Sequence, residues 1–229
     1  MLNVINIGNT NVQTAVYSGG IFYDFRVTPT KEFTAGLPDN GFPAAVASVV
    51  PELNRLFDEN RTLFVSDGIK LGYSFAENVV SSTIGADRLA NASALLDLGV
   101  PAVCIDAGTA VTFETLNSDG EFAGGAIMPG RSLMREALYS FTAQLPKVPI
   151  SPVIPEMGKN TADAVAMGVD RGLIGAVKEI CSELAAGADR RIVVTGGDAD
   201  FILKYFPAAE PADKFFTLRG IVRIWELNR

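Results

Sequence analysis

One local pattern occurs at the start of this chain and again in its middle, and it limits the folds that the chain can adopt. The first copy is an apolar run at residues 2–7, followed by the turn Gly8-Asn9-Thr10-Asn11. The second is an apolar run at residues 100–105, followed by Asp106-Ala107-Gly108-Thr109 and further β-branched residues. Each copy predicts a buried strand, a tight turn with close backbone approach, and a second strand leaving the turn.

The segments that follow each copy come in the same order. Three strands are expected at 2–7, 12–16 and 21–26, then a short helix from 30, a strand at 44–50, a helix at 52–59, a strand at 62–65 and a helix from 86. The second series has strands at 101–106, 109–116 and 121–128, a helix at 131–142, a helix from 160 to about 185, a strand at 191–195, a helix after 199 and a helix at about 218–228. We therefore expect two βββαβα-like halves, residues 1–98 and 99–229, produced by internal duplication.

Two such halves would face each other across a cleft, with one glycine turn from each half directed into it. Helix amino termini and the amides of glycine turns are suited to binding an anion. The phosphate tail of a nucleotide is the expected guest. The copies differ in one charge, because Asn6 occupies the place that Asp106 has in the second copy.

Composition excludes several classes of function. A chain of 229 residues, 48% of them hydrophobic, is large enough for a packed core, and its net charge of −7 argues against a nucleic-acid or anionic-membrane surface. The chain has no His, so bases for neutral-pH chemistry are carboxylates, Lys or Tyr. Cys104 and Cys181 are expected to be reduced and buried. With neither a signal peptide nor a membrane span expected, the predicted location is the cytoplasm.

Three short segments each allow a structural and a functional interpretation. Asp106 could bind backbone amides of its own turn, but the apolar run before it favours a cation ligand beside phosphates. Asp87-Arg88 opens a helix, and spacing alone favours an acid that complements the helix dipole over a proton acceptor beside an anion-binding Arg. Gly196-Gly197-Asp198-Ala199 fits strand-to-helix packing and close approach to an adenosine equally well, whereas Asn160-Thr161 is a helix cap in either case.

Several common nucleotide and hydrolase motifs are absent from the sequence. It has no G-x-x-x-x-G-K-[ST] loop, no G-x-G-x-x-G after a strand and no G-x-S-x-G. P-loop NTPases, simple dinucleotide enzymes and α/β-hydrolases therefore have no support.

Seven segments together resemble one family, the type III pantothenate kinases of the acetate and sugar kinase, Hsp70 and actin superfamily. The resemblance runs nearly from end to end, and its segments are 8–11, 48–51, 85–92, 106–113, 124–130, 158–161 and 195–199. It implies duplicated ribonuclease H-like (actin-like ATPase) halves, each a mixed five-stranded sheet with helices, and an ATP cleft between them. The implied reaction is ATP-dependent phosphorylation of pantothenate to 4'-phosphopantothenate, the first step of coenzyme A biosynthesis.

The same resemblance implies roles for individual residues. Asp87 is the expected catalytic proton acceptor, and Asp106 the ligand of a monovalent cation, K⁺ or NH₄⁺, used together with Mg²⁺. Contacts to ATP are implied for Asn6, Ile7, Gly8, Asn9, Thr10, Asn11, Val12, Gln13 and Thr109. Contacts to pantothenate are implied for Gly85, Ala86, Asp87, Arg88 and Thr161. The family also implies a homodimer with the pantothenate pocket at the subunit interface, so that Thr161 acts across it.

Two positions depart from the family pattern. Asn6 stands where the family has an aspartate that contacts the Mg²⁺–ATP phosphates, so weaker magnesium handling is expected. Asn78 stands where a substrate-contacting tyrosine is usual, and Tyr73 and Phe75 would need a different loop path to replace it. These departures leave two alternatives: a weakly active or inactive nucleotide-binding paralogue with an accessory role, and a kinase of the same fold with another hydroxylated substrate.

Overall fold

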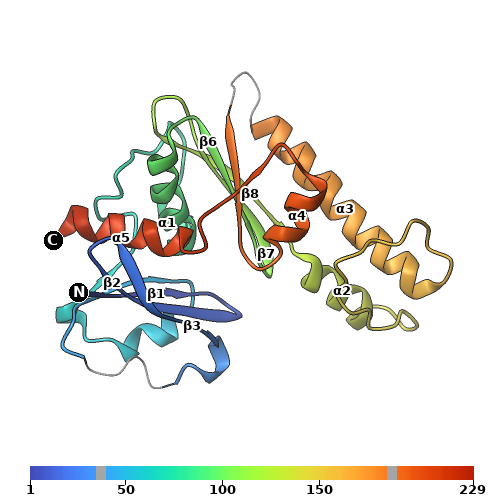
Figure 1. Cartoon of the computed structure of the whole chain (residues 1–229), viewed down its shortest axis with the longest axis horizontal. Coiled ribbons are helices and arrows are strands. Elements are labelled where there is room, and N and C mark those ends of the chain that lie inside the picture. The colour runs from blue at the N-terminus through green and yellow to red at the C-terminus, as the bar shows by residue number, and fades with distance from the viewer. Residues whose placement is uncertain (35–39, 185–189) are drawn as a thin grey trace. The chain divides into compact units, whose positions relative to one another are not determined.

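The computed structural model of the chain describes residues 1–34, 40–184 and 190–229. The chain divides into two compact units, which are described separately. Unit 1 comprises Met1–Ala102, Leu116–Gly124 and Asp213–Arg229, and unit 2 comprises Val103–Thr115 and Gly125–Ala212. Two five-stranded sheets with helices make up the structure (Figure 1).

The first sheet has the order β3-β2-β1-β4-β5. Its strands are β1 (Leu2–Ile7), β2 (Asn11–Ser18), β3 (Ile21–Pro29), β4 (Ala44–Ser48) and β5 (Thr62–Phe64). β1 pairs antiparallel with β2 and parallel with β4, so the sheet is mixed. Side chains alternate along β1: Leu2 and Val4 join the cluster that includes α1 and α5, whereas Ile5 and Ile7 pack with Phe57 on the other face.

The second sheet has the order β10-β9-β6-β7-β8, which repeats the order of the first sheet strand for strand. Its strands are β6 (Ala102–Ala107), β7 (Ala110–Leu116), β8 (Phe122–Pro129), β9 (Arg191–Thr195) and β10 (Glu210–Pro211). The predicted duplication and fold class are therefore confirmed at the level of topology. β10 was not predicted, because a strand of only two residues carries no hydrophobic periodicity.

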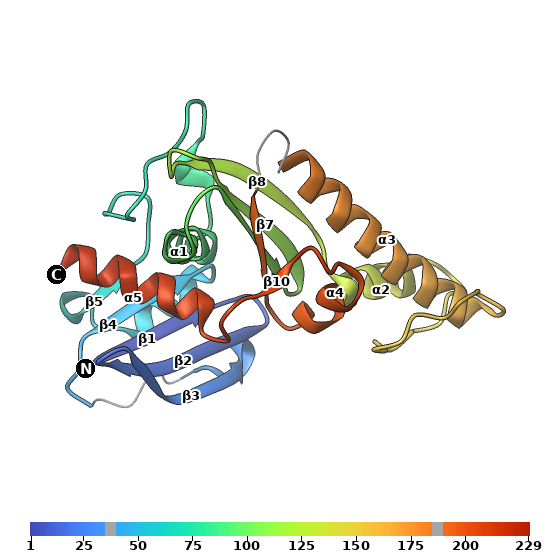
Figure 2. The same cartoon turned by 45° about the horizontal axis from the view of Figure 1, so that its top comes forward.

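Two helices cover one face of the first sheet in unit 1. These are α1 (Ala86–Leu95), continued by the 3₁₀ turn η5 (Leu96–Leu98), and α5 (Phe216–Asn228). Figure 2 shows α1 and α5 side by side over the β1–β4 region. Their contact requires a glycine, because a Cβ on Gly220 of α5 would lie 1.8 Å from the carbonyl oxygen of Ala90 in α1.

The helices of unit 2 are α2 (Arg131–Ser140), α3 (Thr161–Leu184) and α4 (Ala199–Tyr205). Asn160 caps α3 as predicted, because its side-chain oxygen accepts a hydrogen bond from the amide of Asp163 at 2.9 Å. None of the helices in the described ranges combines the length and apolar character that crossing a bilayer requires.

One helix prediction is wrong and another is reduced to a single turn. Instead of a helix at 52–59, the chain forms two 3₁₀ turns, η2 (Pro51–Leu56) and η3 (Glu59–Arg61). The two turns are separate because the backbone of Phe57 is extended. The Asp58 side chain then starts the second turn by accepting a hydrogen bond from the Asn60 amide at 3.0 Å. The short helix expected from residue 30 is the 3₁₀ turn η1 (Thr30–Glu32). Its predicted end by residue 38, and that of α3 at about 185, lie outside the described residues.

Both cysteines are free and buried, as expected. Burial raises the pKa of the Cys104 thiol well above its usual value, and the charges of Glu114 and Asp106 raise it further. Burial alone raises the pKa of Cys181 to about 12. Because the thiolate is the reactive form, neither residue is suited to nucleophilic chemistry.

Candidate functional site

The first glycine turn joins β1 to β2 and is fixed by backbone hydrogen bonds. The Gly8 amide donates to the carbonyl oxygen of Asn11 at 3.0 Å, and the Thr30 amide donates to that of Thr10 at 2.9 Å. Beyond the end of β4, the Val49 amide donates to the carbonyl oxygen of Ile7 at 3.0 Å. These bonds fix the path of the turn.

The second glycine turn, between β6 and β7, is held in the same three ways. The Gly108 amide donates to the Ala110 carbonyl at 3.0 Å, and the Gly130 amide, just after β8, donates to that of Thr109 at 2.9 Å. Beyond β9, the amide of Asp198 donates to the Ala107 carbonyl at 2.9 Å. The duplication therefore extends to the hydrogen bonds that shape each turn. In each copy one bond lies within the turn, one comes from the residue after the third strand, and one comes from a residue beyond the parallel neighbouring strand.

Two glycines enclose the second turn from opposite neighbours. A Cβ on Gly130 would lie 2.2 Å from the carbonyl oxygen of Gly108, and a Cβ on Gly196 would lie 2.6 Å from backbone atoms of Ala107. Gly196 also has a φ of +92°, which L side chains rarely adopt. Gly130 and Gly196 are thus explained by packing against the turn that carries Asp106 and Thr109.

Asn6 and Asp106 occupy equivalent positions, each the last residue but one of the first strand of its sheet. By strand alternation Asn6 shares a face with Leu2 and Val4, the face that α1 covers. Its Oδ1 is buried and has no hydrogen-bond partner among the described residues. An acceptor left open in this way fits a donor supplied by a ligand or by ligand-bound water.

Asp87 lies in the first turn of α1, after the cap residue Gly85. Its Oδ1 accepts a hydrogen bond from the Arg88 amide at 2.8 Å. Burial raises the pKa of the Asp87 carboxyl, while the hydrogen bond and positive charge of Arg88 partly oppose the rise. A carboxylate with a raised pKa at a helix start is suited to accepting a proton near neutral pH.

Within unit 1, the structure brings the first turn and the Asp87 segment together. Val49 joins them: its amide bonds to Ile7, and its side chain would lie 3.3 Å from a Cβ on Gly85. The same Cβ would lie 2.7 Å from Oδ1 of Asp87, so a side chain at position 85 would displace the carboxylate. Both segments therefore meet at the carboxyl ends of the parallel strands β1 and β4, where open α/β sheets bind ligands.

The aromatic residues before α1 are engaged in packing. The Tyr73 hydroxyl donates to the carbonyl oxygen of Leu89 at 3.1 Å, and the rings of Tyr73, Phe75 and Phe122 contact one another. Asn78 follows with a φ of +67°. In this conformation Tyr73 and Phe75 secure the loop to α1 and β8.

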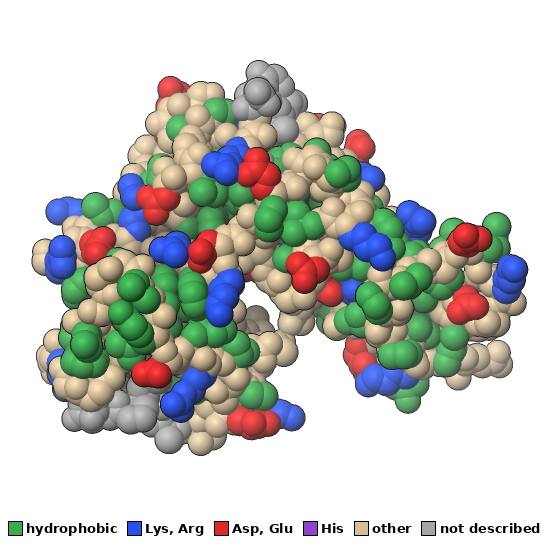
Figure 3. All heavy atoms as spheres, in the orientation of Figure 1, with side chains coloured by type: hydrophobic (Ala, Val, Ile, Leu, Met, Phe, Trp, Pro, Cys, Tyr) green, Lys and Arg blue, Asp and Glu red, His purple; other side chains and the backbone are tan. Residues whose placement is uncertain are grey.

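Thr161 lies at the start of α3. It lines an apolar groove of about 790 Å³ formed by α2, α3 and the segment between them, with Leu133 and Phe141 among the lining residues. Leu133 is 44% exposed and Phe141 is 89% exposed. Figure 3 shows hydrophobic side chains on the surface of this part of unit 2.

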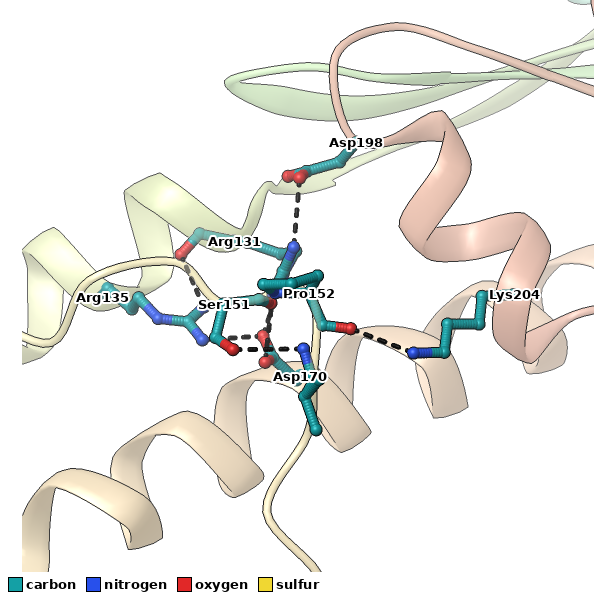
Figure 4. A network of polar contacts seen from close by, with 8 residues as sticks. Arg131, Arg135, Ser151, Pro152, Asp170, Asp198 and Lys204 are labelled. Atoms are coloured by element: carbon teal, nitrogen blue, oxygen red, sulfur yellow. Dashed lines mark hydrogen bonds and ion pairs between the residues drawn. The ribbon is translucent and has the colours of Figure 1, made fainter.

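A buried charge cluster in unit 2 was missed from the sequence. Arg131 and Arg135 of α2 both contact Asp170, a fully buried residue of α3 (Figure 4). Arg131 also contacts Asp198, directly after the Gly196-Gly197 pair. The available signal was an acid within the apolar face of α3 and two arginines four residues apart on α2.

The donor set for a cation is small. Among the described residues, no group of three or more Asp, Glu, Cys or His side chains is placed to hold a metal ion. Mg²⁺ is usually held by one or two carboxylates together with substrate phosphates and water, so its binding does not require such a group. The candidate oxygen donors are the carboxylate of Asp106 in unit 2 and, separately, the open amide oxygen of Asn6 in unit 1.

Comparison with known proteins gives a consistent result. The family profile described as type III pantothenate kinase matches residues 2–183. The type III pantothenate kinase of Geobacter sulfurreducens is 32% identical, and that of Anaeromyxobacter dehalogenans strain 2CP-C is 33% identical; in both cases all of both chains is covered.

Solved structures share the fold at lower identity. A Baf family protein from Campylobacter jejuni superimposes with a TM-score of 0.71 at 21% identity, covering 99% of this chain and 98% of that one. Component A of (R)-2-hydroxyglutaryl-CoA dehydratase from Acidaminococcus fermentans gives a TM-score of 0.55 at 13% identity, covering 97% and 95%. The fold is the actin-like ATPase fold, as the sequence predicted.

Proposed function

The chain belongs to the type III pantothenate kinase family, and we propose that it transfers the γ-phosphoryl group of ATP to the primary hydroxyl of pantothenate. The observation that carries this proposal is the placement of Asp87 in unit 1. Its carboxylate has a raised pKa and is joined through Val49 to a glycine turn of phosphate-binding character. A proton acceptor beside a phosphate-binding turn is what phosphorylation of an alcohol requires.

In this proposal Asp87 orients the pantothenate hydroxyl and accepts its proton as the oxygen attacks phosphorus. Gly85, Ala86 and Arg88 hold the substrate around it, Arg88 by its charge. Residues 6–13 line the ATP phosphates, and Thr109 also contacts ATP. Mg²⁺, when bound, neutralises charge on the phosphoryl group during transfer, and Asp106 holds a monovalent cation that adds to this effect.

Activity is tested by a coupled ADP-release assay on wild type and Asn6→Asp, with pantothenate, across Mg²⁺ concentrations, with and without K⁺. A new carboxylate at position 6 restores a charged contact to the magnesium–phosphate group. If that contact adds about 1.4 kcal/mol, half-maximal activity needs roughly tenfold less Mg²⁺ than in wild type. Asn6→Gln, which adds no charge, is the matched control and should not lower the Mg²⁺ requirement.

The outcomes separate the alternatives. Turnover by wild type supports the kinase, and loss of turnover on omitting K⁺ supports the role given to Asp106. If wild type is inactive even at high Mg²⁺ and Asn6→Asp restores turnover, the protein is an accessory paralogue that has lost the carboxylate at position 6. If neither protein phosphorylates pantothenate while both bind ATP, the substrate assignment fails.

We also propose that a second copy of the chain covers the groove between α2 and α3. The groove is lined almost entirely by apolar side chains, and its lining residues Leu133 and Phe141 are exposed, as is typical of an association site. Thr161 lies in the groove, so a partner bound there would bring its own surface to this proposed pantothenate contact.

Leu133→Glu is expected to convert the homodimer to a monomer, because the interface would then bury an unpaired carboxylate. Sedimentation equilibrium of wild type and variant measures the change. Ile21→Glu, at an exposed position of β3 in unit 1, is the control that adds the same charge and should leave the dimer intact. A wild-type monomer, or a Leu133→Glu dimer, would contradict the proposal.

A further inference from the structure

The guanidinium of Arg131 makes an unusual number of contacts for a residue that is 2% exposed. Its Nε lies 2.9 Å from Oδ1 of Asp170, and its Nη2 lies 3.1 Å from Oδ2, so this pair is bidentate. Its Nη1 donates to Oδ1 of Asp198 at 3.2 Å, and Nη2 also donates to the carbonyl oxygen of Ser151. The centroid of the Phe201 ring of α4 lies 3.5 Å from the guanidinium carbon.

Stability alone does not explain this arrangement. Asp170 is fully buried and already has a second partner, because Nη2 of Arg135 lies 2.9 Å from its Oδ1. Buried ion pairs often stabilise a fold no more than apolar side chains of similar volume would. Buried ion pairs do fix the relative positions of their side chains. Here the fixed set includes Asp198, whose side chain is 21% exposed although its partner Arg131 is buried.

Asp198 is attached to the strand end that carries Asp106. Its amide donates to the Ala107 carbonyl, and Gly196, two residues earlier, has no room for a side chain against Ala107. On its other side the same strand end contacts Gly130, which immediately precedes Arg131. The turn is therefore contacted on one side by Gly130, the chain neighbour of Arg131, and on the other by Asp198, the ion-pair partner of Arg131.

We propose that Arg131 is a positioning residue for the nucleotide, which fixes the Gly196-Gly197-Asp198 turn relative to the turn of Asp106 and Thr109. The inference rests on the proposed binding of ATP. On this proposal both interpretations of the Gly196-Gly197 pair hold: Gly196 packs against Ala107, whereas Gly197, where a Cβ would meet no atom within 4 Å, leaves room for the nucleotide. Loss of the link lets this turn move while the strand end stays in place.

Asp198→Asn tests the link with little risk to folding, because it keeps the shape of a partly exposed side chain and removes only its charge. Without the ion pair, the Kd for ATP, measured by isothermal titration calorimetry, should rise about tenfold, as expected for loss of one charge-assisted hydrogen bond. The KM for ATP should rise with it, while the KM for pantothenate stays the same. Glu210→Gln, which breaks the exposed Arg191–Glu210 pair of the same unit, should change neither value.

A second variant separates positioning from stabilisation. Arg131→Met/Arg135→Met/Asp170→Leu replaces the buried charges by apolar side chains, which can retain the melting temperature. The inference expects ATP binding to remain about tenfold weaker in this variant even with the melting temperature retained. If this triple variant is destabilised, the inference is tested with Asp198→Asn alone.

The results distinguish this inference from the proposed function. If wild type binds ATP and Asp198→Asn binds it equally well, Arg131 has no positioning role and the inference is overturned alone. The inference would also be overturned if the triple variant bound ATP with the affinity of wild type. If wild type binds no ATP, the proposed function fails and the inference fails with it.

Discussion

Asp87→Asn is expected to lower kcat for pantothenate phosphorylation by roughly 10²–10⁴-fold, the usual contribution of a positioned general base. The amide keeps the size of the side chain but cannot accept the proton of the attacking hydroxyl. ATP affinity should change little, because the proposed phosphate contacts are made by other residues of unit 1 and by Thr109. Initial-rate kinetics and nucleotide titration measure the two effects separately.

Stability provides the control for this substitution. A folded-state pKa above the ordinary value means that the fold favours the neutral carboxyl, so the contribution of Asp87 to stability is lost as the pH rises through that pKa. At neutral pH the neutral amide should therefore keep or raise the melting temperature. A variant that is stable, binds ATP and retains wild-type kcat would remove Asp87 from the role of base.

The pH profile gives a second signature of the same residue. Only ionised Asp87 can accept a proton, so kcat/KM must fall as the pH falls through its pKa. Because burial raises that pKa above the ordinary 3.8, the fall should begin at a higher pH than for an exposed aspartate. In Asp87→Asn the residual activity should lack this acidic limb.

Gly220→Ala is the second substitution with a large expected effect. The added Cβ would lie 1.8 Å from the carbonyl oxygen of Ala90 and 2.6 Å from its carbonyl carbon, which are backbone atoms that cannot rotate away. Helix α5 must then move off α1. Overpacking of this kind costs about 3 kcal/mol, which lowers the melting temperature of a chain of this size by roughly 6–12 °C.

A matched helical glycine isolates this cause. Gly172 lies on an exposed face of α3, and a Cβ there would meet no atom within 4 Å. Gly172→Ala should stabilise the protein by about 0.5–1 kcal/mol, because alanine loses less conformational freedom in a helix. Thermal unfolding of both variants decides the matter, and equal melting temperatures would show that α5 does not depend on Gly220.

Local patterns determined much of this protein. Apolar runs ending in glycine turns located both copies of the strand–turn–strand motif, and the structure confirms the repeated strand order with Asn6 and Asp106 at equivalent positions. These features depend on neighbours in sequence and on alternation along a strand, which a single chain displays directly. The cap of α3 at Asn160 is local for the same reason.

Contacts between distant residues were decided only by tertiary structure. The sequence could not show that Gly220 of the last helix rests on Ala90, or that Val49 connects the first glycine turn to Gly85. It also gave Asp198 two equal interpretations, because its partner Arg131 lies 67 residues away. Burial of a charge becomes informative only when its partner is known, since the cost of desolvation is offset by that partner. The repeat was therefore visible in the sequence, whereas the way in which its glycines and charges fix the turns was visible only in the folded chain.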